Sequence, residues 1–201
     1  MAELDDLREH LERYRAVTLQ ALDLVTDEDL GWRPGPDHYT LGQQFMHIAQ
    51  SEDFQVQAHL NGDWDYERVR FPARDLKVDE LRVLLSETRG RTIVALEELD
   101  EKRLDEPVDH GKGQPIQTLR WWLWLLVEHE VHHKAQIAVY LRQMGKTPPY
   151  FAAALETGAR PDIEVQEKLG GFGRREQSLQ DEVIGADSET AGTLTDTGQS
   201  S

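Results

Sequence analysis

Three histidines stand close together in the segment His129-Glu130-Val131-His132-His133. His129 and His133 are four residues apart, so a helix would place both on one face, one turn apart. Two imidazoles at this spacing can bind one metal ion, with a third ligand supplied from elsewhere in the chain. Three neutral imidazoles plus water form the open arrangement of catalytic metal sites, whereas structural sites fill all four positions. The segment therefore predicts a metal centre with room for a reacting molecule.

The choice between His132 and His133 depends on the apolar face of the surrounding helical pattern. His129 and His132, three residues apart, form the competing pair. The apolar face passes through Leu126 and Tyr140, and His133 shares that face while His132 leaves it. We therefore prefer His129 and His133 as the pair.

A third ligand is expected from another long helix. His47 lies between Met46 and Ile48, in the middle of a different helical pattern. Taken alone, a histidine in such a position is more often a core residue than a ligand. However, facing helices in a bundle lie about 8–10 Å apart, so imidazoles from opposite sides can meet on one ion. The predicted metal ligands are therefore His47, His129 and His133.

The same segment also satisfies the H-E-x-x-H pattern of zincin proteases. In that interpretation Glu130 would be the general base, and Glu156 or Glu164 would be the third ligand. The pattern is short and arises by chance, and no strand-rich subdomain is evident that could bind an extended peptide. A further alternative is that the histidines are core residues that bind nothing.

The composition restricts the chemistry of any metal site. The chain has 201 residues and no cysteine, so thiolate ligands, disulfides and a cysteine nucleophile are all excluded. Nitrogen and oxygen ligands favour zinc or nickel, and iron or manganese are also compatible. Any thiol that reacts at the site must therefore come from a cosubstrate.

The charge of the chain excludes several classes of partner. A net charge of −16 argues against nucleic-acid binding and against anionic membrane surfaces. The acidic start of the sequence lacks the basic and apolar regions of a signal peptide. The longest apolar run, residues 121–127, is far too short to span a bilayer. We expect a cytoplasmic protein whose partner is a small-molecule substrate.

The elements that would position the histidines are four amphipathic helices. Apolar residues recur at helical spacing over residues 4–25, 41–60, 78–101 and 119–144. Thr40 and Thr118 are good N-caps, and Gly62 and Gly145 suit the helix ends. This pattern predicts an all-α fold, a four-helix bundle. The long second and third connections allow either plain up-down order or a crossover.

The C-terminal part of the sequence differs in composition from the rest. Residues 161–201 contain nine acidic and three basic side chains, with many Gly, Ser, Thr and Gln. Such a segment buries too little apolar surface to fold, which predicts a disordered acidic tail. We therefore divide the chain into a bundle domain, residues 1–160, and a tail, residues 161–201.

Several segments of the chain together resemble the DinB/YfiT-like family of metal-binding four-helix bundles. They are residues 30–41 (LGWRPGPDHYTL), 45–52 (FMHIAQSE), 129–136 (HEVHHKAQ) and 140–145 (YLRQMG) with the Pro148 that follows. The resemblance covers roughly residues 1–157. The family commonly has Arg-Gly where this chain has Lys134-Ala135, a change that leaves the predicted ligands untouched.

The resemblance implies a divalent metal ion bound by His47, His129 and His133, and a homodimer. Its better understood relatives include S-transferases and isomerases that use low-molecular-weight thiols. The leading hypothesis is therefore a metal-dependent transferase that activates such a thiol. The alternatives are a metal-dependent hydrolase that uses bound water, and a bundle that binds a metal or small ligand without catalysis.

Overall fold

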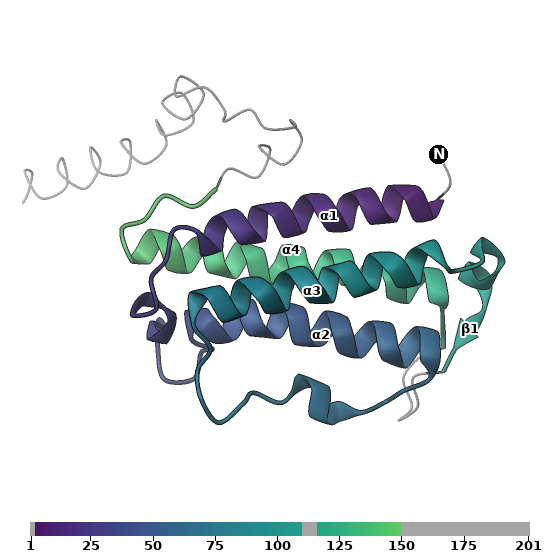
Figure 1. Ribbon diagram of the computed structural model, residues 1–201, viewed down its shortest axis with the longest axis horizontal. Coiled ribbons are helices and arrows are strands. Elements are labelled where there is room, and N and C mark those ends of the chain that lie inside the picture. The colour runs from purple at the N-terminus through teal and green to yellow at the C-terminus, as the bar shows by residue number, and fades with distance from the viewer. Residues whose placement is uncertain (1–2, 110–115, 150–201) are drawn as a thin grey trace, which may run out of the picture. The chain divides into compact units, whose positions relative to one another are not determined.

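The computed structural model describes residues 3–109 and 116–149. Four long helices dominate this part of the chain (Figure 1). They are α1 (Glu3–Leu22), α2 (Leu41–Asn61), α3 (Val78–Glu97) and α4 (Leu119–Gln143). The all-α four-helix bundle is therefore confirmed. The predicted tail, residues 161–201, and the boundary at residue 160 lie outside the described residues.

The helix ends follow the local chemistry of the sequence. The Thr40 hydroxyl accepts a hydrogen bond from the backbone N–H of Gln43, whose side chain accepts one from the Thr40 N–H. This reciprocal pair begins α2, and the Thr118 hydroxyl caps α4 in a similar way. Gly62 and Gly145 end these helices with φ of 70° and 74°, values that glycine adopts without steric cost.

The helices pack in an order that differs from their order in the sequence. Both α1 and α2 pack against α3 and α4, so α1 lies diagonally opposite α2. Neighbouring helices α2 and α3 run in the same direction (Figure 1). The connection between them, residues 62–77, therefore returns along the bundle and contains the 3₁₀ helix η2 (Tyr66–Val69). Of the two predicted possibilities, the structure has the crossover.

The region between α3 and α4 contains more regular structure than the sequence indicates. The third helix ends at Glu97 rather than residue 101, and the Asp100 side chain then accepts the Lys102 N–H to begin the 3₁₀ helix η3 (Glu101–Asp105). Strands β1 (Pro107–Val108) and β2 (Gln117–Thr118) form a two-residue antiparallel pair. Strands this short leave no periodic signal, and the sequence had suggested no strand pair.

The interior of the bundle contains two apolar clusters. One centres on residues such as Leu22, Phe45 and Ile137, and the other on residues such as Leu11 and Leu123. Buried polar and charged side chains at intermediate positions of all four helices lie along the same faces: Arg15, Thr18, Glu52, Thr88, Arg89, Thr92 and Glu130. Among the described residues, no helix is long and apolar enough to cross a membrane.

Candidate metal centre

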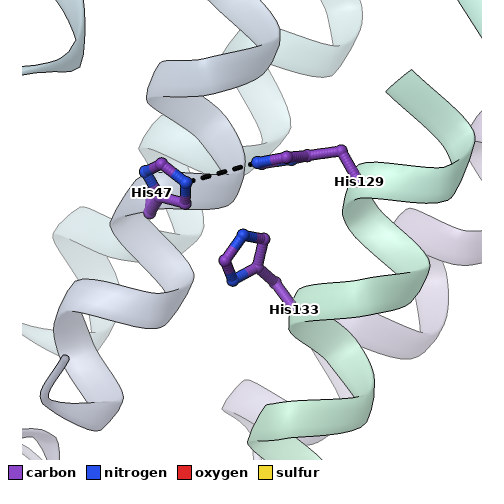
Figure 2. A group of neighbouring side chains, drawn as sticks. All are labelled: His47, His129 and His133. Atoms are coloured by element: carbon purple, nitrogen blue, oxygen red, sulfur yellow. Dashed lines mark hydrogen bonds between the residues drawn. The ribbon is translucent and has the colours of Figure 1, made fainter. Parts of the chain in front are cut away.

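The structure brings together the three histidines that the sequence selects. His47 comes from α2, and His129 and His133 come from successive turns of α4 (Figure 2). The Nε2 atoms of His47 and His129 are 3.3 Å apart. One ring nitrogen from each histidine lies within 4.8 Å of the other two. By contrast, His132 is exposed and contacts Gln136 on its own helix, which agrees with the preference for His133.

The spacing of the nitrogens fits one metal ion. In a tetrahedral site with metal–nitrogen bonds of about 2.0–2.1 Å, two ligand nitrogens are about 3.3–3.4 Å apart. The His47–His129 distance has this value. The 4.8 Å limit on the group means that a small side-chain movement would bring the third nitrogen to the same distance. Imidazole nitrogens alone suit zinc, nickel, iron or copper better than magnesium or calcium, which prefer oxygen.

The surroundings of the histidines keep them neutral. Burial, and next the neighbouring imidazoles, lower the pKa of His129 to about 4 and that of His133 to about 3. Burial also lowers the pKa of His47, with a further contribution from His132. At neutral pH the nitrogen lone pairs are therefore available, and no proton has to be displaced before a cation binds.

A hydrogen-bond chain orients His133. Its Nδ1 lies 2.7 Å from Oε1 of Gln44, and the Gln44 amide N–H donates to the Tyr140 hydroxyl at 3.3 Å. With an amide oxygen as its partner, Nδ1 carries the proton and Nε2 keeps its lone pair. Gln44 is buried on α2, one turn before His47. The sequence analysis missed this residue, although its position one turn from His47 is a recognisable signal.

Two aromatic side chains lie beside the histidines. The ring of Tyr39, from the loop before α2, is 5.4 Å from that of His47. The ring of Phe71, from the crossover connection, is 5.1 Å from Tyr39 and 6.4 Å from His47. Tyr39 is exposed, and His47 and His129 are half-buried. The histidine cluster is therefore reached from solvent past an aromatic pair.

Comparison with known proteins places this bundle in a family. The profile of the DinB superfamily matches residues 10–137, which include all three histidines except for the bounds of the flanking loops. The chain belongs to the DinB superfamily. The family expected from the sequence is therefore confirmed.

Individual relatives of this DinB-superfamily protein agree with the family assignment. Uncharacterized YjoA of Bacillus subtilis strain 168 is 27% identical over 149 residues, covering 73% of this chain and 94% of YjoA. The crystal structure of YjoA, a DinB-like protein, matches with a TM-score of 0.61 at 25% identity, over 73% of this chain and 97% of the other. YfiT from Bacillus subtilis, described as a probable metal-dependent hydrolase with an unusual four-helix bundle topology, matches with a TM-score of 0.60 at 24% identity, over 73% and 91%.

A buried group of four charges lies next to the histidines along the same helices. We call it the ion cluster, and it takes one residue from each helix of the bundle: Arg15, Glu52, Arg89 and Glu130. Each guanidinium contacts both carboxylates, with nitrogen–oxygen distances of 2.5 to 3.3 Å. Thr18 also donates to Glu130, at 2.7 Å. Two positive and two negative charges are thus buried together with no net charge.

The ion cluster defines the state of the two glutamates. Burial alone would raise the pKa of Glu52, but the guanidinium groups of Arg15 and Arg89 lower it to about 2. The same arginines outweigh burial at Glu130 and lower its pKa. Glu130 is therefore an ionised, fully engaged carboxylate. It does not face the histidines as the general base of a zincin would, and the alternative third ligands Glu156 and Glu164 lie outside the described residues.

Proposed function

We propose that His47, His129 and His133 bind one divalent metal ion, zinc or nickel, and that the protein is a metal-dependent enzyme. The observation that supports this is the convergence of three neutral imidazoles from two helices, with two nitrogens already 3.3 Å apart. Three protein ligands leave a fourth position for water or substrate. When bound, the metal would supply a Lewis acid that lowers the pKa of a coordinated thiol or water.

We further propose that the nucleophile is a low-molecular-weight thiol and the reaction an S-transfer. The two glutamates that accompany the histidines on α2 and α4, Glu52 and Glu130, are held by Arg15 and Arg89 and cannot accept a proton at neutral pH. A thiol with a pKa of about 8.5 ionises at a metal without a protein base, whereas water starts from about 15.7. The chain has no cysteine, so the thiol is a cosubstrate.

The chain's own residues would then bind and orient the reactants. His47, His129 and His133 hold the metal, and Gln44 keeps the Nδ1 proton on His133 so that its Nε2 faces the ion. Tyr39 and Phe71 offer an apolar surface beside His47 for the electrophile. Burial of the histidines keeps their protons from competing with the metal.

A second candidate is a hydrolase that uses bound water. The similarity to YfiT, a probable metal-dependent hydrolase, favours it. A metal ion can bring the pKa of bound water to about 7 without a carboxylate base. The two candidates share the metal site and differ in whether a thiol must be added for turnover.

Metal analysis of protein purified without a histidine tag tests the site. We expect about one equivalent of zinc or nickel in the wild type and in His132→Ala, and loss of metal in His133→Ala. His132 is the matched control, because it neighbours His133 on α4 but is exposed. Full metal content in His133→Ala or His47→Ala would contradict the proposal.

The reaction is tested by following the consumption of small electrophiles by the metal-loaded protein. Loss of electrophile only when a thiol such as glutathione, bacillithiol or mycothiol is added would support the transferase. Turnover of esters or amides without any thiol would support the hydrolase and overturn the transferase. Stoichiometric metal with no turnover in either assay would favour a non-catalytic metal-binding bundle.

A further inference from the structure

A second cavity lies on the side of α2 that faces α3. Its volume is about 300 Å³, and it is bounded by α2, α3 and the crossover connection. Met46, Leu76 and Leu84 are among the apolar side chains that line it. This volume is at the lower end for small-molecule sites, which are typically about 300–1,000 Å³ and mostly apolar with a few polar groups.

The polar lining of this cavity carries the opposite sign to the protein as a whole. Three arginines line it, Arg68 and Arg70 from the crossover connection and Arg91 from α3, together with the carboxylate of Asp53. The lining therefore has a net charge of +2, from three positive and one negative group, in a chain of net charge −16. Guanidinium groups are suited to binding carboxylate or phosphate oxygens.

The arginines are only partly engaged by the protein. Asp53 receives one hydrogen bond from Arg68 and one from Arg91, both at 3.2 Å. Arg68 also donates to Asp63 at 2.7 Å, and Arg70 pairs with Glu67 at 2.9 Å on the exposed surface. The Nε of Arg68 is buried and has no hydrogen-bond partner among residues 3–109 and 116–149. A single carboxylate thus serves two guanidinium groups at the cavity, and donors remain for an anion.

We propose that this cavity binds a small molecule with an apolar body and one anionic group, a carboxylate or a phosphate. The apolar body would contact Met46, Leu76 and Leu84, and the anion would be held at the rim by Arg68 and Arg91. The site is separate from the histidines. Arg70 and Pro72 line the cavity, whereas Phe71 between them contacts His47.

Binding is tested with octanoate, which has a short apolar chain and one carboxylate, and with uncharged octan-1-ol. We expect saturable amide shifts from octanoate at Met46, Leu84 and Arg91 in ¹H–¹⁵N spectra of the full chain, and weaker binding of octan-1-ol. Octyl phosphate in place of octanoate shows which anionic group is preferred. Equal affinity for octan-1-ol and both anions would overturn the proposal, because it would show no role for the arginines.

Variants assign the binding to this cavity. Arg91→Gln is expected to weaken octanoate binding about fivefold, the upper range for an exposed ion pair. The control is Arg82→Gln, from the same helix but outside the cavity, where it pairs with Asp23. His129→Ala should leave octanoate binding unchanged, which separates this site from the proposed metal. Equal weakening by Arg82→Gln, or loss of the shifts in His129→Ala, would overturn the assignment.

Discussion

The histidine cluster and the ion cluster are made by the same two helices but have opposite chemistry. On α4, His129 and Glu130 are consecutive, and on α2, His47 and Glu52 are little more than one turn apart. Glu52 and Glu130 face the arginines of α1 and α3, where each carboxylate is paired twice over. His47 and His129 instead direct neutral nitrogens at each other, with no cation between them.

The difference shows how a structural polar layer is distinguished from a binding site. In the ion cluster the opposite charges are supplied from within the protein, so the group has no remaining demand for a ligand. In the histidine cluster three electron-pair donors converge, and nothing in the described chain supplies the acceptor they share. Both groups are polar and largely buried, so burial alone would not separate them.

The largest expected effect is on the ion cluster. Glu130→Gln leaves the two buried guanidinium groups of Arg15 and Arg89 with the single charge of Glu52. Removing one partner of a buried ion pair costs about 3–5 kcal/mol, so the free energy of unfolding should fall by that amount in urea titrations. Protein that remains folded should still bind metal.

A matched control for Glu130→Gln is Glu97→Gln. Glu97 also pairs across two helices, with Arg8 at 3.9 Å, but more than half of its side chain is exposed. The change should cost less than about 1 kcal/mol. A stable Glu130→Gln protein that had lost activity alone would support the zincin interpretation and break the comparison.

The next effect is the stabilisation that the metal itself provides. A ligand that binds only the folded state at one hundred times its dissociation constant adds about 2.7 kcal/mol to the free energy of unfolding. Zinc or nickel should therefore raise the stability of the wild type and His132→Ala, and EDTA should reverse the change. His47→Ala should show no such rise. If it gained as much as the wild type, the metal would be binding elsewhere.

A smaller effect is expected from the residue that orients His133. Gln44→Leu removes the partner of the His133 Nδ1 while keeping a side chain of similar size. Loss of such a supporting hydrogen bond lowers metal affinity about 10- to 100-fold. Competition with a chelator measures it. Gln43→Leu is not a suitable control because Gln43 caps α2, whereas Gln136→Leu changes an amide that contacts only exposed His132 among the contacts described.

Much of the fold follows from the sequence because its signals are local. Hydrophobic periodicity and the capping residues Thr40, Gly62, Thr118 and Gly145 place all four helices to within a few residues. The direction of α3 relative to α2 was left open. A connection of sixteen residues can either turn back or return along the bundle, and the contacts that decide between them are not local.

The grouping of the histidines was predictable for the same reason, whereas the ion cluster was not recognised. His129 and His133 are related by helix periodicity, and the position of His47 on a facing helix suggested the third member. Arg15 and Glu130 also interrupt apolar series, between Leu11 and Leu22 on α1 and after Leu126 on α4. Each interruption looks accidental alone, and only the packing of four helices shows that the charges compensate one another.

The smallest expected effect, a change of stability with pH, separates the two clusters by where it occurs. The folded pKa of His129, about 4, is below its ordinary value of 6.5, so the unfolded chain binds more protons between these values. Stability of the metal-free protein should therefore fall as the pH decreases from 6.5 toward 4, by up to about 1.4 kcal/mol per pH unit for each such histidine. The pKa of Glu52 is lowered from 4.5 to about 2, so its contribution is lost only below pH 4.5.

Urea titrations in EDTA at pH 7, 6 and 5 measure the histidine contribution alone, because this range lies above that of Glu52. His129→Ala should flatten the dependence, since its protonation no longer opposes folding, and His132→Ala should not. Bound metal should oppose the loss for as long as it outcompetes protons. An unchanged slope in His129→Ala would mean that the acid sensitivity arises from other groups, and the contrast between the two clusters would then rest on geometry alone.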